Sequence, residues 1–164
     1  MTNHRVIGIG ETVLDILFKN DQPLKAVPGG STFNSIVSLG RAGVNSVMLT
    51  EVGGDHVGDM ICRFLNENGV SSEYVFRRGH VKSPISLAFL DEHNDAYPVQ
   101  PIETVSTVGA GDNFNAGYIY AKIQNIDDQA SQIAMAQRWS QDVCRQLGNN
   151  ISDELVVILK KEQI

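Results

Sequence analysis

The stretch "TVGAGDNFNAG", residues 107–117, places three glycines and one aspartate ahead of an apolar segment. Glycines at 109 and 111 allow backbone N–H groups to point toward a common centre, because no Cβ atom stands in the way. A helix predicted from about residue 113 to residue 123 adds unpaired N–H groups and the positive end of its dipole. The stretch therefore predicts an anion site, with the carboxylate of Asp112 at its mouth.

Two interpretations of Asp112 are open from spacing alone. A carboxylate is repelled by a static phosphate, but it is useful as a base that takes a proton from a hydroxyl attacking the phosphorus. The alternative is a glycine turn followed by an aspartate that caps a helix, which is a common arrangement. The stretch matches neither the phosphate loop that ends in Lys and Ser/Thr nor the G-x-G-x-x-G dinucleotide motif.

Composition restricts the class of protein. The chain has 164 residues, enough for one domain, and a net charge of −6, which argues against nucleic acid as a partner. It contains no apolar run near the ~20 residues that span a bilayer. The two cysteines, Cys62 and Cys144, lie far apart, and no signal peptide is recognised, so we expect reduced thiols in the cytoplasm. The four histidines show no zinc-like spacing, and no metal ligand is predicted.

Apolar runs bounded by turn residues predict strands, and apolar residues at helical spacing predict helices. The predicted strands cover residues 5–10 (a buried first strand), 12–18, 45–55, 72–78, 83–95 and the buried run "VVILK" (156–160). The predicted helices run from Ser31 to a stop at Gly43, from a cap at Asp55 to Gly69, and from Asp127 or Asp128 to Gly148. Residues 20–30 are rich in turn residues. Alternating strands and helices predict an α/β layered fold.

Two glycine motifs read together, "PGGSTFNSIVSLGRAG" (28–43) and "STVGAGDNFNAG" (106–117), resemble those of the PfkB, or ribokinase-like, carbohydrate kinase family. "GIGETVLDI" (8–16) and "TEVGGDHVGDMICRFLNENGV" (50–70) are similar to the same family in the same order. The resemblance implies a mostly parallel sheet flanked by helices, with a small β lid formed by residues around 12–18 and 72–96.

The same resemblance implies one domain built from two parts. Residues 1–96 would hold the sugar site and the lid. Residues 97–164 would hold the anion hole, the catalytic aspartate and the helices on the nucleotide side.

The resemblance also implies the residues that bind the sugar, which are Asp15, Gly29, Gly30 and Asn34. A carboxylate accepts protons from two neighbouring hydroxyls, and an asparagine side chain both donates and accepts. The two glycines would let the backbone approach the substrate. The alternatives are a strand-end aspartate in a local turn for Asp15 and an exposed polar helix residue for Asn34.

On the phosphate side, the resemblance implies an anion hole at Gly109, Ala110 and Gly111, with Asp112 as the catalytic base. It places Thr107, Gly109, Gly111 and Cys144 near the nucleotide. Members of the family use ATP with Mg²⁺, and often a monovalent cation. This chain has Ser106 where the family often has aspartate, which weakens the case for the monovalent cation.

The sequence departs from the family in length. Only about ten residues, Tyr97 to Ser106, separate the lid-like segment from the second glycine motif, where the family has several strand–helix units and a polar motif serving Mg²⁺. The central strand–helix units are therefore expected to be missing. A sheet without them would expose edges and apolar faces, and we expect a homodimer.

The expected function is a sugar kinase that transfers the γ-phosphoryl group of ATP to a hydroxyl of a carbohydrate. A fructose-like hexose is the expected substrate. The alternatives are a non-catalytic remnant that binds sugar and a nucleoside kinase of the same fold.

Overall fold

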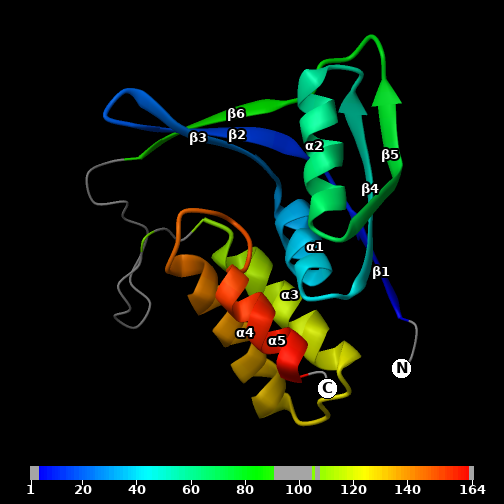
Figure 1. Cartoon of the computed structure of the whole chain (residues 1–164), viewed down its shortest axis with the longest axis vertical. Helices are drawn as coiled ribbons and strands as arrows, with labels where there is room; N and C mark the ends of the chain where they lie inside the picture. The colour runs from blue at the N-terminus through cyan, green and yellow to red at the C-terminus, as the bar shows by residue number, and fades with distance from the viewer. Residues whose placement is uncertain (1–3, 91–104, 106–107, 163–164) are drawn as a thin grey trace.

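The computed structural model of the chain describes residues 4–90, 105 and 108–162. Within these residues the fold consists of two three-stranded sheets and five helices (Figure 1). Strands and helices alternate in the first half, and helices alone follow in the second half. The predicted α/β architecture is therefore confirmed.

The main sheet is entirely parallel, with the strand order β1-β4-β5. Its strands are β1 (Arg5–Ile9), β4 (Asn45–Gly53) and β5 (Val70–Arg78). The helices α1 (Ser31–Arg41) and α2 (His56–Glu67) cover one face of it (Figure 1). Each helix connects two neighbouring parallel strands, as parallel pairing requires.

The lid sheet has the order β3-β2-β6. A hairpin joins β2 (Val13–Lys19) to β3 (Gln22–Gly29) through Asn20 and Asp21, whose φ angles of 52° and 59° suit a tight hairpin turn. The third strand, β6 (Ile85–Leu90), runs parallel to β2.

Two predictions about the lid are wrong. Of the turn-rich residues 20–30, only Asn20 and Asp21 form the hairpin turn, and Gln22–Gly29 form strand β3, because β3 lies at the edge of its sheet, where prolines are tolerated. Residues 72–78 belong to β5 of the main sheet and not to the lid, since β5 pairs with β4. The predicted strand 83–95 is confirmed over Ile85–Leu90. Residues 83 and 84 precede the strand, and residues 91–95 lie outside the described residues.

A bundle of three helices follows, comprising α3 (Ala110–Ile123), α4 (Gln129–Cys144) and α5 (Asp153–Glu162). Asp128 caps α4 by accepting a hydrogen bond from the Ser131 backbone N–H at 2.8 Å.

The helices α3 and α4 cross closely at Gly117. A Cβ atom there would lie 2.9 Å from the Ala136 Cα and 2.9 Å from the Trp139 Cγ. The rings of Tyr120 and Trp139 then pack with their centroids 5.1 Å apart.

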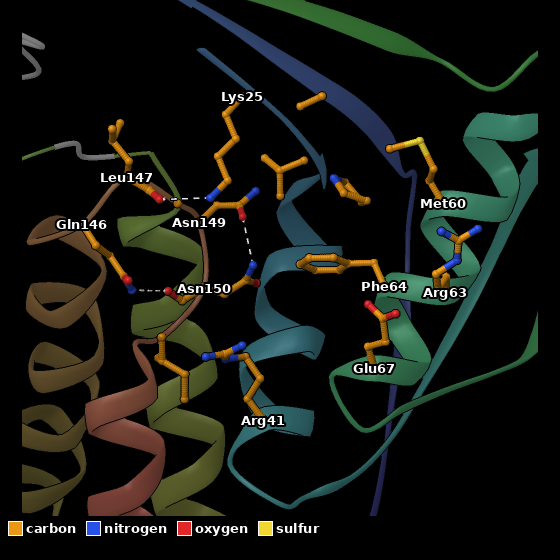
Figure 2. A pocket seen from close by; sticks show the side chains of 15 residues that line it. Lys25, Arg41, Met60, Arg63, Phe64, Glu67, Gln146, Leu147, Asn149 and Asn150 are labelled. Atoms are coloured by element: carbon orange, nitrogen blue, oxygen red, sulfur yellow. Dashed lines mark hydrogen bonds between the residues drawn. The ribbon is translucent and has the colours of Figure 1, made fainter.

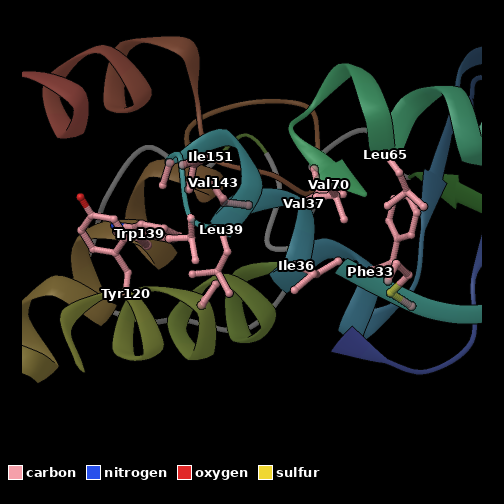
Figure 3. Close-up of a cluster of buried hydrophobic side chains, with 14 of the residues drawn as sticks. Phe33, Ile36, Val37, Leu39, Leu65, Val70, Tyr120, Trp139, Val143 and Ile151 are labelled. Atoms are coloured by element: carbon pink, nitrogen blue, oxygen red, sulfur yellow. The ribbon is translucent and has the colours of Figure 1, made fainter. Parts of the chain in front are cut away.

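One hydrophobic core joins the main sheet to the bundle (Figure 3). The largest fully buried side chains come from α1, α2, β4, α4 and α5, and α1 lies between the two halves. They include Phe33, Ile36, Leu39, Met48, Ile61, Leu65, Trp139 and Leu159. The core therefore holds the N-terminal and C-terminal parts of the chain together.

The final apolar run forms a helix and not the predicted strand. The Ser152 Oγ accepts a hydrogen bond from the Leu155 backbone N–H at 3.1 Å, which caps the first turn of α5. Asp142 accepts hydrogen bonds from the backbone and the hydroxyl of Ser152, which fixes this turn against α4. Leu155 and Leu159, four residues apart, are the buried side chains of α5. The five residues of the run 156–160 are too few to distinguish a helical period from a buried strand.

The first strand is not buried as predicted, because one face of the main sheet is uncovered. Ile7 and Ile9 are 54% and 68% exposed, and Tyr74 and Phe76 are 44% and 59% exposed. No helix in the described part of the chain packs on this side, which we call the open sheet face. It lies opposite α1 and α2.

Within the described residues, none of the helices has both the length and the apolar character needed to cross a membrane.

Asp55 connects α2 to the segment that leads into β6. Its carboxylate accepts hydrogen bonds from the Gly58 backbone N–H at 2.9 Å, and from the backbone and the hydroxyl of Ser83, both at 2.8 Å. The predicted helix cap is confirmed. The hydrogen bonds from Gly58, then those from Ser83, lower the pKa of Asp55 to about 2.

Because this pKa is depressed in the folded state, the stability that Asp55 contributes is present above the unfolded-state value of 3.8 and is lost as the pH falls through about 2. As the pH falls from about 4 to about 2, the free energy of unfolding should decrease less in Asp55→Asn than in the wild-type protein. Urea denaturation across this range measures the effect. Asp21→Asn, in the exposed hairpin, is the control, and an unchanged pH slope in Asp55→Asn would contradict the assignment.

Candidate active site

The glycine stretch forms the first turn of α3. The helix begins at Ala110, three residues before the predicted start, so Gly111 and Asp112 lie inside it. Gly109 precedes the helix with a φ of 82°, and a Cβ atom there would lie 2.9 Å from the Asn149 carbonyl oxygen. The first N–H groups of α3 have no partners within the helix, and the helix dipole adds positive potential. This geometry suits an anion.

Asn113 holds this turn in place. Its side chain is fully buried, and its Nδ2 donates hydrogen bonds to the carbonyl oxygens of Gly109 and Asn149, both at 2.8 Å. Its Oδ1 accepts a hydrogen bond from the Ser38 hydroxyl of α1. Sequence analysis missed Asn113 as a positioning residue, because these contacts span up to 75 positions.

Asp112 joins α3 to the start of α1. Its Oδ1 accepts a hydrogen bond from the Ser31 hydroxyl at 2.7 Å, and its Oδ2 accepts one from the Asn34 Nδ2 at 3.0 Å. The Ser35 hydroxyl donates to the Asp112 backbone oxygen at 2.8 Å. The carboxylate is therefore held in one orientation, between two helix N-termini. Ser31 and Ser35 were not predicted from the sequence.

Asn34 is only 5% exposed, so the interpretation of an exposed polar residue is wrong. Its amide nitrogen binds Asp112, but its Oδ1 is buried and has no hydrogen-bond partner among the described residues. A buried acceptor normally finds a donor. The predicted role of Asn34 in sugar binding stays a prediction.

Asp15 lies on β2 opposite Val27 of β3, and its carboxylate lies against Gly29, two residues further along β3. A Cβ atom on Gly29 would collide with the Asp15 carboxylate, so only glycine leaves this side chain in place. Burial raises the pKa of Asp15, and a hydrogen bond with Ser86 partly opposes the increase. Asp15 is thus a half-buried carboxyl group on the inner side of the lid.

Asp15 lines a small cavity of about 100 Å³ between the lid sheet and the loops at Val108 and Asn149. Pockets for small ligands commonly hold about 300–1,000 Å³. The cavity beside Asp15 is therefore smaller than a common small-ligand pocket.

The turn at Gly30 lies between Gly29, which contacts Asp15, and Ser31, which binds Asp112. Gly30 has a φ of 123°, and a Cβ atom there would lie 2.6 Å from the Glu11 carbonyl oxygen. The structure thus gathers most of the predicted site residues around one turn and the start of α3.

Cys144, a predicted nucleotide-side residue, lies in the helical bundle at the end of α4. It is buried, and burial raises the pKa of its thiol. Its carbonyl oxygen accepts a hydrogen bond from the Val105 N–H at 2.8 Å. Contact of Cys144 with a nucleotide stays a prediction. Thr107 and Ser106 lie outside the described residues.

The described residues suit phosphate better than Mg²⁺. A Cβ atom on Gly111 would meet no atom within 4 Å, so the space beside the Gly111 Cα is open. Among the described residues no group of three or more His, Cys, Asp or Glu side chains could hold a metal ion.

The family model described as "pfkB family carbohydrate kinase" matches the chain in two segments, residues 6–97 and 88–154. The chain belongs to the PfkB family of carbohydrate kinases. The first segment contains the sugar-side residues of the site, and the second contains the turn at Gly109 with Asp112. The family resemblance predicted from the two glycine motifs is confirmed.

Relatives of known activity agree with this family. Ribokinase of Bacillus subtilis is 29% identical over 139 residues, which cover 83% of this chain and 43% of that protein. Fructokinase of Salmonella typhimurium is 27% identical over 93 residues, which cover 57% of this chain and 30% of that protein. The chain thus spans less than half the length of these relatives.

A solved structure shows the same fold. Aminoimidazole riboside kinase from Salmonella enterica, in complex with aminoimidazole riboside and an ATP analog, matches with a TM-score of 0.75 at 12% identity. The match covers 95% of this chain and 99% of that chain. The predicted ribokinase-like fold is therefore confirmed.

Alanine substitutions at Gly109 and Gly111 should change the stability of the protein in different directions. Gly109→Ala is expected to lower the free energy of unfolding by about 1–2 kcal/mol or more, because its φ is positive and Asn149 blocks a Cβ atom. Gly111→Ala should leave stability unchanged or raise it by up to about 1 kcal/mol, since its Cβ atom would enter open space in a helix. Urea denaturation measures both. Equal destabilisation would contradict this geometry.

Proposed function

We propose that this chain carries the sugar site and the phosphoryl-transfer site of an ATP-dependent carbohydrate kinase. The observation that supports the proposal most directly is the junction of α1 and α3. There an oriented carboxylate, Asp112, lies in the first turn of a helix, next to Gly111, whose Cβ position is open space.

In this proposal Asp112 is the catalytic base. It accepts the proton of the sugar hydroxyl as that oxygen attacks the phosphorus. Ser31 and Asn34 keep the carboxylate in one orientation, and an incoming hydroxyl can replace the Ser31 hydroxyl at Oδ1. Positioning of this kind accounts for much of the catalysis in phosphoryl transfer.

The N–H groups of Ala110 and Gly111 stabilise the negative charge on the transferred phosphoryl group. They lie at the positive end of α3, and Gly109 allows the chain to turn there without a Cβ atom in the way. ATP, when bound, supplies the phosphoryl group. Thr107 and Cys144 remain proposed nucleotide-side residues, and Mg²⁺ and a monovalent cation remain expectations from the family.

On the sugar side, Asp15 accepts hydrogen bonds from two neighbouring hydroxyls, and the unpaired Asn34 Oδ1 accepts another. Gly29 and Gly30 bring the backbone close to the sugar. The lid sheet closes over it and excludes water. A fructose-like hexose is the proposed substrate, and a nucleoside is the alternative of the same fold.

A second candidate function is sugar binding without catalysis. Two observations favour it. Both carboxylate oxygens of Asp112 already accept hydrogen bonds from α1, as in a purely structural contact. In addition, the chain spans only 43% of the ribokinase that it matches.

The proposed setting is a reducing cytoplasm, in which Cys62 and Cys144 stay as the free thiols that the structure shows. The proposed ligands are a sugar and ATP. A nucleic-acid partner is not proposed, since the net charge is −6.

The decisive test compares Asp112→Asn with Ser31→Ala. Both remove a hydrogen bond between α1 and α3, but only the first removes the base. We predict that ADP release with fructose and ATP falls by about 10²–10⁴-fold in Asp112→Asn and changes far less in Ser31→Ala. Equal losses in the two variants would mean that Asp112 is structural.

The same assay separates the other candidates. Turnover with adenosine but not with fructose would identify a nucleoside kinase. Calorimetric binding of fructose without any turnover would support the non-catalytic function, and clear turnover by the 164-residue chain would end that alternative.

We also propose that the chain forms a homodimer through the open sheet face. Exposed apolar side chains lie between two ion pairs on this face, Arg5–Glu73 at one end of the strands and Arg78–Glu51 at the other. A two-fold axis between the ends would bring each ion pair onto the other, so the face is complementary in charge to a second copy of itself.

Sedimentation velocity tests this dimer. Phe76→Lys, in the open sheet face, should shift the protein to a monomer, because a charge would be buried without a partner. Val157→Lys, on an exposed position of α5, should leave the mass unchanged. A monomeric wild-type protein, or a dimeric Phe76→Lys variant, would refute the proposal.

A further inference from the structure

A second and larger pocket adjoins the small cavity at Asp15, with which it shares Val27, Leu147, Gly148 and Asn149. It has a volume of about 380 Å³ and opens between β3, the helices α1 and α2, and the loop that joins α4 to α5 (Figure 2). This volume falls in the range of about 300–1,000 Å³ that is common for small-ligand sites. The residues proposed above for catalysis and sugar binding do not line it.

Positive charge is concentrated in this pocket. Lys25 enters from β3, Arg41 from α1 and Arg63 from α2 (Figure 2). The opposing carboxylates are Glu67 in the lining and Asp153, which pairs with Arg41 at 2.5 Å. Three cations thus face two carboxylates, in a chain whose net charge is −6.

Two polar atoms of the lining are buried and have no hydrogen-bond partner within the described part of the chain. They are the Arg41 Nε, a donor, and the Asn150 Oδ1, an acceptor. The other nitrogens of Arg41 are held, by Asn68 at 2.8 Å and by Asp153. Buried polar atoms are usually satisfied, so these two would gain a hydrogen bond from a polar ligand that displaces the side chains covering them.

The loop side of the pocket is fixed. The Lys25 Nζ donates a hydrogen bond to the Leu147 carbonyl oxygen at 3.2 Å, and the Gln146 Nε2 donates one to the Asn150 carbonyl oxygen at 2.7 Å (Figure 2). On the side of α2, Met60 and Phe64 form an apolar wall. The pocket therefore combines cationic donors with a surface that suits the flat body of a small molecule.

We propose that this pocket binds a small phosphate-bearing anion, either a phosphate monoester or inorganic phosphate, through Lys25, Arg41 and Arg63. A phosphate group offers acceptor oxygens to several cationic donors at once, and guanidinium groups match its geometry. A phosphate monoester with a ring body binds more tightly than inorganic phosphate, because the ring packs on Phe64 and Met60. The proposal does not depend on kinase activity.

Calorimetry with phenyl phosphate, inorganic phosphate and phenol tests the site. Arg63 and Glu67 are exposed on the same helix, so their variants should fold normally. Arg63→Gln is expected to weaken binding of phenyl phosphate about threefold to tenfold, and Glu67→Gln to strengthen it by a smaller factor. Opposite changes on one helix face cannot arise from partial unfolding. Arg138→Gln, which removes a surface ion pair with Glu162, is the matched control and should change nothing.

Each outcome decides the proposal. Phenyl phosphate binding more tightly than inorganic phosphate, with phenol not binding, supports it. If Gly111→Ala abolishes binding and Arg63→Gln does not, the phosphate occupies the first turn of α3 and the proposal is wrong. Absence of binding by either phosphate compound, or equal binding by phenol, also overturns it.

Discussion

The contact between Asp112 and the start of α1 is the interaction on which the rest of the site depends. Ser31 and Asn34 bind the carboxylate, Ser35 binds its backbone, and Ser38 reaches Asn113 one turn further along. Four polar residues on one side of α1 thus meet the first turn of α3. Because the bundle packs on the other half of the molecule mainly through α1, the same contact orients the bundle and shapes the anion turn. Stability and proposed chemistry therefore share one set of hydrogen bonds.

Much of the fold follows from local patterns. Asp55 and the apolar period after it predict α2, and Gly43 marks the end of α1 with a φ of 84°. The two glycine motifs predict most of the site, because Gly29, Gly30 and Gly109 leave no room for a Cβ atom. Each of these signals rests on a requirement of the backbone within a few residues, and such requirements are visible in a sequence.

The parts that local patterns missed depend on distant neighbours. β3 carries two prolines and forms only because it pairs with β2 at the edge of a sheet. β1 has the apolar pattern of a buried strand, yet Ile9 is exposed, since no described helix covers that face. Asn113 contacts residues on α1 and in the loop at Asn149, and its own stretch gives no sign of them. Only the resemblance to a family could anticipate which distant segments meet.

The position of the single tryptophan has a practical consequence for spectroscopy. Trp139 is fully buried in α4 beside Tyr120 of α3 and above Gly117, far along the chain from either sheet. Its emission spectrum will report on the packing of the helical bundle and of the part of the core that joins the bundle to α1. Far-ultraviolet circular dichroism averages over both halves. A difference between the two signals during denaturation would reveal whether the bundle separates from the sheets before they unfold, and hence whether the molecule melts as one cooperative unit.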